Sequence, residues 1–148
     1  MRTPASVAGH PIHPMLVTVP IGLWLFSFVC DLILLKSENP DLWETLAFYA
    51  MAGGIIGALA AAIPGTIDML SLSGQPRKTA QIHMGINLAV VALYAVNLWL
   101  RLHGSDDEVE KGPIIMSAVT VVMLAISGWL GGHLVYRHGV AVNTTNDD

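Results

Sequence analysis

The sequence predicts an all-α integral membrane protein, in which residues 1–148 form a single transmembrane domain, a four-helix up-down bundle. The chain is 53% hydrophobic and only 12% charged, about half the charged fraction of a typical soluble domain. Four apolar segments each reach the roughly 20 residues that cross a bilayer, and short polar loops separate them. Lipid excludes open sheet edges, and these segments are too long for barrel strands.

The first two segments are expected at about residues 15–35 and 42–70. The first contains Pro20, and it is too long for the apolar core of a cleavable signal peptide, so we expect it to be retained as a helix. The second ends close to Asp68. The pair Pro64-Gly65 is expected to kink this helix or to end its regular part.

The third and fourth segments are expected at about residues 82–102 and 113–136. Pro113 stands at a favourable position for the first turn of a helix. The loop between these segments is the most charged stretch of the chain. Cys30 is the only cysteine, which excludes an intramolecular disulfide and a multi-cysteine metal site.

Basic residues predict the orientation in the membrane. The side with the N-terminus, the second loop and the tail carries Arg2, Arg77, Lys78 and Arg137, whereas the other side carries Lys36, Arg101 and Lys111. The excess of positive charge favours both termini in the cytoplasm. No basic stripe suitable for nucleic acid is present.

Small residues recur at spacing four on two helices: Gly53, Gly57 and Ala61 on the second, and Gly128 and Gly132 on the fourth. Such stripes let membrane helices approach closely, so we expect bundle packing there. The alternative is that they leave room for a flat cofactor.

Five of the six histidines fall on the side of the termini. They are His10, His13, His83, His133 and His138. Counted from Pro113 at 1.5 Å per residue, His133 is about 30 Å along its helix, level with His83. Asp68 joins this layer, and His103 lies on the opposite side. Ionisable residues in a bilayer are costly and mark functional sites.

This histidine cluster is compatible with three kinds of site. Imidazoles from different helices are suited to axial ligation of haem. A transition-metal ion is also suited to His13, His83, His133 and Asp68. A proton or quinone site is the third option. The alternatives are structural roles. The histidines could form a polar network that ties helix ends together, and His10 and His138 could contact lipid headgroups. Asp68 could form an ion pair with Arg77 or Lys78, and Asp31 could bond a neighbouring helix.

Four motifs resemble a bacterial inner-membrane family known as domain of unknown function 2231. They are residues 9–22, residues 65–68, His83 with Asn87, and residues 128–139. The resemblance covers nearly the whole chain and implies an inner-membrane location. Some members resemble fusions to Rieske-type ferredoxin domains, which implies redox work by association. This chain lacks the cysteines of such a domain, so an iron–sulfur partner would be a separate protein.

We therefore expect a b-type cytochrome-like electron-transfer protein that holds haem b at the cytoplasmic ends of its helices. His13, His83 and His133 form the expected ligand pool, with His10 and His138 in reserve. A non-haem transition-metal protein is the second expectation, and a structural or accessory subunit without cofactor is the third. The expected partners are the lipid bilayer and a redox partner such as a Rieske-type ferredoxin or a quinone, and a homo-oligomer is a further option. No catalytic nucleophile is evident.

Overall fold

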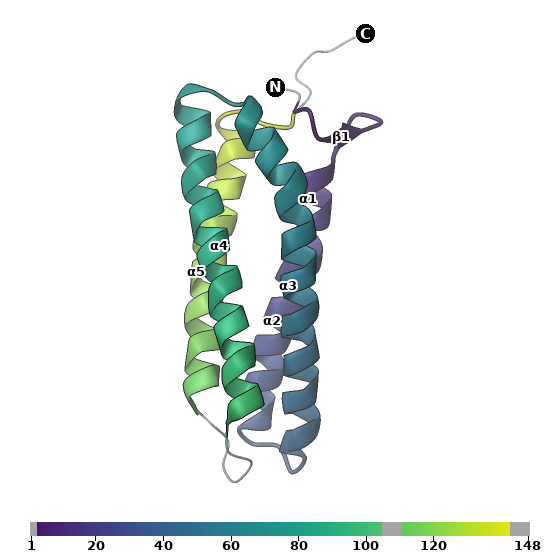
Figure 1. The fold of residues 1–148 in the computed structure, drawn as a ribbon, viewed down its shortest axis with the longest axis vertical. Helices are drawn as coiled ribbons and strands as arrows, with labels where there is room; N and C mark the ends of the chain where they lie inside the picture. Colours follow the sequence, from purple (N-terminus) through teal and green to yellow (C-terminus); the bar gives the residue numbers. More distant parts are fainter. Residues whose placement is uncertain (1–2, 105–110, 143–148) are drawn as a thin grey trace.

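The computed structural model describes residues 3–104 and 111–142, and four long helices dominate them (Figure 1). These helices are α2 (Thr18–Leu34), α3 (Pro40–Ser71), α4 (Gly74–His103) and α5 (Lys111–Tyr136), and the short α1 (Ile12–Leu16) precedes α2. With α1 joined to α2, each of the four is long and apolar enough to cross a membrane. The predicted four-helix membrane bundle is therefore confirmed.

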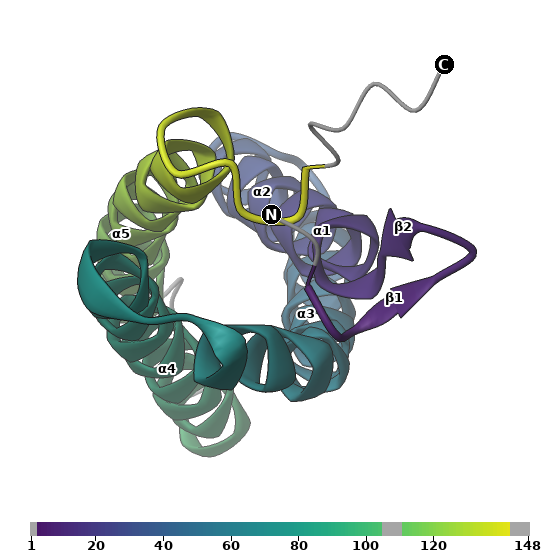
Figure 2. The same cartoon turned by 90° about the horizontal axis from the view of Figure 1, so that it is seen from above.

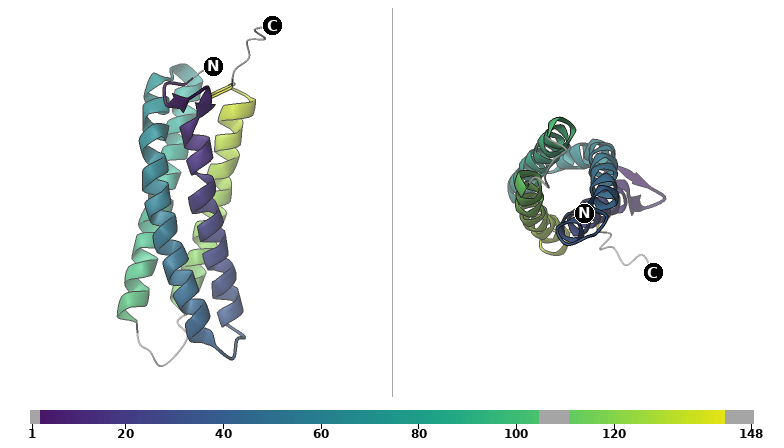
Figure 3. Two further views of the ribbon diagram at one scale, coloured as in Figure 1. Left: turned by 90° about the vertical axis from the view of Figure 1, so that its right-hand side faces the viewer. Right: turned by 90° about the horizontal axis from the view of Figure 1, so that it is seen from below.

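The helices are arranged as a ring (Figure 2). α2 packs against α3, α3 against α4, α4 against α5, and α5 returns to α2. Consecutive helices are therefore antiparallel neighbours, and α2 and α4 run in the same direction on opposite sides of the ring. Both ends of the described chain lie at one end of the bundle (Figures 1 and 3), which we call the terminal end; the other is the distal end.

A small hairpin precedes the bundle at the terminal end. Its strands are β1 (Ser6–Val7) and β2 (His10–Pro11), with Ser6 opposite Pro11 and Val7 opposite His10. Ala8 and Gly9 both have positive φ, as the two-residue turn of such a hairpin requires. The chain then enters α1 directly, so His13 is helical.

The predicted helix limits need two corrections. α4 begins at Gly74, eight residues before the predicted position 82, because most of the predicted loop is helical. α3 stays helical through Pro64 to Ser71, so its regular part does not end there. The alternative, a kink, agrees with the bend of α3 near the terminal end (Figures 1 and 2), since proline removes one backbone hydrogen bond from a helix. By contrast, the first spanning segment is interrupted at Val17, between α1 and α2, one turn before Pro20. Pro20 has no backbone N–H, so the Leu16 carbonyl lacks its helical partner.

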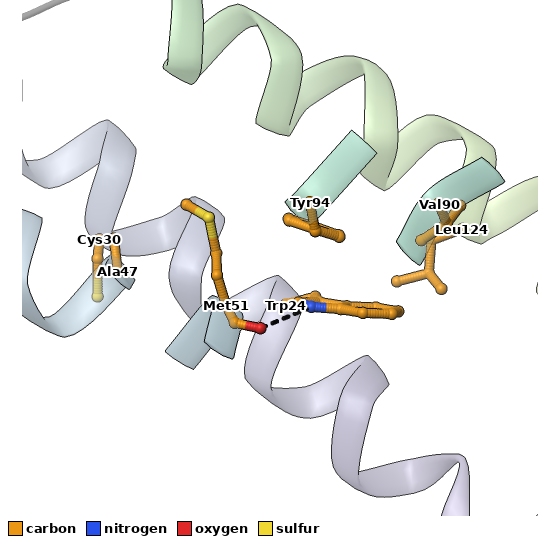
Figure 4. Close-up of a cluster of buried hydrophobic side chains, with 7 residues drawn as sticks. All are labelled: Trp24, Cys30, Ala47, Met51, Val90, Tyr94 and Leu124. Carbon is orange, nitrogen blue, oxygen red and sulfur yellow. Dashed lines mark hydrogen bonds between the residues drawn. The ribbon is translucent and has the colours of Figure 1, made fainter. Parts of the chain in front are cut away.

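The middle of the bundle is filled by an aromatic pair from opposite helices. Trp24 of α2 stacks on Tyr94 of α4 with ring centroids 4.6 Å apart. The Trp24 indole N–H donates to the carbonyl of Met51 in α3 at 3.3 Å (Figure 4). A Cβ on Gly54 would lie 2.3 Å from the indole nitrogen. Glycine at this position therefore lets α3 approach the tryptophan.

The segment of α1 and α2 faces α4 in one register. His13 lies opposite His83, Trp24 opposite Tyr94, and Asp31 opposite Arg101. Each of these pairs is separated by 70 positions in the sequence. Between them, buried positions follow the four–three spacing of a packed helical seam. The three pairs therefore mark successive layers from the terminal end to the distal end.

The interior of the bundle holds polar side chains among its apolar ones. Its buried residues include Ser27, Asp31, Asn97, Ser117, Thr120 and Ser127. Large apolar side chains cover the outside, for example Ile56 at 70% exposure and Trp129 at 79%. A surface of this kind is suited to lipid, and the buried polar side chains must find their partners within the bundle.

Candidate functional site

His13 is held by one face of α3. Its Nδ1 donates to the carbonyl oxygen of Ala61 at 2.8 Å. A Cβ on Gly65, one turn further along, would lie 2.7 Å from that same Nδ1. A carbonyl oxygen can only accept a hydrogen bond, so Nδ1 carries the proton and Nε2 of the neutral ring keeps its lone pair. This is the tautomer that metal-binding histidines use.

His83 is held by α5 in a similar way. Its Nδ1 lies 2.9 Å from the carbonyl oxygen of Ser127 and 3.0 Å from the Ser127 hydroxyl. The amide nitrogen of Asn87, one turn later in α4, lies 3.1 Å from Nε2. Nδ1 again carries the proton, and the Asn87 amide donates to the lone pair of Nε2. Because α4 starts early, His83 lies in its third turn and deeper in the bundle than predicted.

The two imidazoles face each other across the bundle. Their ring centroids are 6.3 Å apart and their planes are nearly perpendicular, at 88°. Two metal–nitrogen bonds of about 2 Å each, extended to the ring centres, span about 6 Å. The pair is therefore at the separation that one metal atom between two imidazoles requires.

A cavity of about 340 Å³ surrounds this histidine pair. All four spanning helices line it, mainly with apolar side chains, and Gly128, Gly131 and Gly132 of α5 belong to its wall. Trp24 closes it towards the middle of the bundle. Leu72 and Val140 close it at the terminal end, where they pack in a second apolar cluster. The volume lies at the lower end of the range for small-molecule sites.

The two predicted small-residue stripes have different surroundings. A Cβ on Gly53 or Gly57 would meet side chains of α2 at 3.1–3.2 Å, so this stripe serves close helix packing, as expected. A Cβ on Gly128 or Gly132 would meet no side chain within 4 Å. These two glycines leave open space along the cavity.

Asp68 anchors the N-terminal segment. Its Oδ1 accepts the backbone N–H of Ala5 at 2.8 Å, and the carboxylate is buried. Among the described residues it forms no ion pair with Arg77 or Lys78, the partners that we had considered. Ala61, Gly65 and Asp68 lie on one face of α3, so a single helix face holds both the N-terminal segment and His13.

The other predicted histidines lie outside the cavity lining. His133 packs against His138, with ring centroids 5.2 Å apart, although residues five apart do not share one face of a helix. The chain leaves the helix after Tyr136, and this brings the two rings together. His10 is exposed and contacts the Ala8 carbonyl. His103 stacks on Trp99 at the distal end, as far from the cluster as predicted.

The sequence reasoning missed Ser127 as a contact of the site, and it noted Asn87 only as part of a motif. The signal for both was the four–three spacing of positions that face the bundle interior: Asn87 follows His83 by four, and Ser127 precedes Gly131 by four. Because neither residue is ionisable, neither attracted attention as a site residue.

The donor set favours a cofactor that brings ligands of its own. Among residues 3–104 and 111–142, no group of three or more His, Cys, Asp or Glu side chains could hold a metal ion. Two imidazoles alone leave most coordination positions of an ion unfilled. A porphyrin supplies four nitrogens and needs only two axial ligands.

One comparison with known proteins gave a match. A family model described as "Predicted membrane protein (DUF2231)" matches residues 9–144, nearly the whole chain. No curated protein and no solved structure matches it.

Proposed function

The chain belongs to the DUF2231 family of predicted membrane proteins, and from the geometry of its cavity we propose that it is a b-type cytochrome-like electron-transfer protein. The observation that carries the proposal is the pair His13 and His83, with ring centroids 6.3 Å apart across an apolar cavity. Each ring is oriented by a backbone carbonyl at Nδ1. A bound haem would supply reversible one-electron chemistry at its iron.

The protein's own residues then orient the ligands and keep the site dry. Ala61 and Ser127 fix the imidazole rings through Nδ1, and such contacts also make the ligating nitrogen more basic. Asn87 would have to release Nε2 of His83 when the ligand binds. The apolar lining and the cap of Leu72 and Val140 limit water access, which is one of the factors that set a haem potential.

A single transition-metal ion held by the same histidines is the second candidate. His13 and His83 would be its protein ligands, whereas His133 pairs with His138 and Asp68 already accepts the Ala5 N–H. The ion would need further ligands from water or from a small molecule. For this reason we prefer haem.

We further propose a bacterial inner-membrane location with the terminal end in the cytoplasm. Arg101 is buried in an ion pair with Asp31, so it should not be counted among the loop charges. The excess of basic residues at the terminal end thereby grows by one, which strengthens the positive-inside argument. A soluble redox partner such as a Rieske-type ferredoxin, or a quinone in the membrane, would then exchange electrons at this end.

The visible spectrum of the purified full-length protein tests the proposal. We expect a Soret band that shifts on reduction in the wild type and in His103→Ala, and its loss in His13→Ala and His83→Ala. A colourless protein with stoichiometric metal would favour the ion. A protein with neither haem nor metal would instead point to an accessory subunit.

A further inference from the structure

Polar side chains fill the core from the middle of the bundle to its distal end. Arg101 Nη2 donates to Asp31 Oδ1 at 2.7 Å, and Arg101 Nε donates to Asn97 Oδ1 at 2.9 Å. Asn97 in turn donates to the Ser117 hydroxyl and to the Pro113 carbonyl. We call the set Ser27, Asp31, Tyr94, Asn97, Arg101 and Ser117 the polar column.

Three atoms of this column are buried without any hydrogen-bond partner. They are the Ser27 hydroxyl, the Tyr94 hydroxyl and the second carboxylate oxygen of Asp31, which forms no direct hydrogen bond although the Ser117 hydroxyl lies close to that carboxyl. All three residues are fully buried. Ser27 and Asp31 are four apart on α2, so they are neighbours on one helix face. Unpaired polar atoms are rare in native proteins, and each is costly inside a membrane. Buried water satisfies groups of this kind.

At the distal end of the bundle, the polar column reaches the protein surface. Arg101 also lines a depression at the distal end, together with Asp41, Glu44 and Tyr49. We call this depression the vestibule. Asp41 and Glu44 line the vestibule together with the same arginine that holds Asp31, so polar side chains continue from the vestibule into the bundle.

Towards the terminal end, the polar column reaches the side of the cavity that faces the middle of the bundle, which we call the floor of the cavity. Tyr94 stacks on Trp24, and Trp24 lines the cavity that contains His13 and His83. Polar groups therefore extend from the distal face of the membrane to the aromatic pair beneath the histidines.

We propose that buried water molecules link Asp31, Ser27 and Tyr94, so that a hydrated column continues from the vestibule to the floor of the cavity. The column rests on its own geometry and not on the proposed function.

Silver ions test the water path, because they are small and bond thiolates, which are soft ligands. The variant Ser27→Cys, in a Cys30→Ser background, places a thiol in the column. Wild-type Cys30 is the matched control: it is free and equally buried one turn later, but packs with Ala47 of α3 (Figure 4). Membrane vesicles of either orientation receive silver nitrate, and thiols that remain are labelled with a maleimide after unfolding.

We expect loss of the Ser27→Cys thiol when silver is added on the vestibule side only, with Cys30 protected from both sides. Protection of both thiols, or equal loss from both sides, overturns the path. Tyr94→Phe gives a second measurement, with the exposed Tyr136→Phe as control. If Tyr94 bonds water, the midpoint of unfolding should fall by about 2–4 °C. An unchanged or raised midpoint means a dry column and overturns the proposal.

The silver and stability measurements do not involve haem, so a dry column would leave the proposed function standing, and a colourless protein would leave the hydrated column standing.

Discussion

At the residue scale, the position of His13 depends on the absence of a side chain at Gly65. The imidazole packs so closely over α3 that a methyl group there would lie 2.7 Å from Nδ1 and 2.9 Å from Cε1. Real contacts of this length do not occur, so either the ring or the helix must move. The histidine and the glycine therefore work as one unit, although they are far apart in the sequence.

We predict that Gly65→Ala impairs cofactor binding without unfolding the bundle. The added methyl group displaces the His13 ring and breaks its hydrogen bond to Ala61, while the substitution itself favours helix by about 1 kcal/mol. Haem content per protein should fall several-fold. Gly85→Ala is the matched control, because a Cβ there meets nothing within 4 Å. Equal haem content in the two variants would contradict this account of His13.

At the scale of elements, α3 contacts the N-terminal segment, His13 and Trp24. Its face of Ala61, Gly65 and Asp68 holds the N-terminal segment and His13, and its Met51 carbonyl holds Trp24. α1 and α2 on one side and α4 on the other carry the paired residues, and α3 and α5 orient the two histidines of the first pair. The four helices thus divide into two that bring functional side chains and two that hold them.

The Asp68 anchor leads to a prediction about the N-terminal segment. Asp68→Ala leaves the Ala5 N–H without its acceptor, so the segment before α1 should open more often. We expect faster backbone hydrogen exchange over residues 3–12 and weaker cofactor retention, with α3 unchanged. Arg77→Ala should alter neither property, because Arg77 does not pair with Asp68. Unchanged exchange in Asp68→Ala would show that the anchor contributes little.

The buried ion pair of α2 and α4 leads to a second prediction at this scale. Arg101→Met leaves the Asp31 carboxylate buried without a counter-charge, which should lower the free energy of unfolding by about 3–5 kcal/mol. The double variant Asp31→Leu/Arg101→Met should recover most of this loss. Unfolding in detergent measures both, with the exposed Lys111→Met as control. A double variant as unstable as Arg101→Met would argue against a simple pair.

At the scale of the whole molecule, the sequence was sufficient for the fold but only partly for the site. Composition and segment length give four spanning helices because lipid allows few alternatives. They do not show which face of each helix points inward, since lipid-facing residues are as apolar as core residues. The helix face that carries Trp24, Ser27 and Asp31 is the buried one, and its polarity is the reverse of a soluble helix.

His133 shows where this uncertainty matters. Its level along α5 was predicted by counting residues, but its direction was not. At 3.6 residues per turn, His133 lies about 200° around the helix from Gly131, and a Cβ at Gly131 would lie 3.4 Å from His83 Cε1. The tail then folds back and brings His138 to His133. Neither fact can be read from the spacing of histidines alone.

The orientation of the whole molecule leads to the last prediction. With Arg101 buried, the basic residues favour the terminal end in the cytoplasm. A reporter enzyme that is active only in the cytoplasm should therefore be active when fused after Asp148. A reporter that is active only in the periplasm should be inactive at the same position. The reverse result would place the cavity at the outer face and the vestibule at the inner one.

The early start of α4 also bears on how fast electrons would reach the site. Arg77 and Lys78 precede His83 by about 8 Å along the helix, a length that places the histidine just beneath a basic rim at lipid headgroup level. An electron tunnelling from a soluble donor on that rim would cross only the apolar cap of Leu72 and Val140. Encounter would then limit the exchange, and acidic donors would be steered to the rim. Added salt should slow such an exchange, and more steeply for a donor that carries more negative charge.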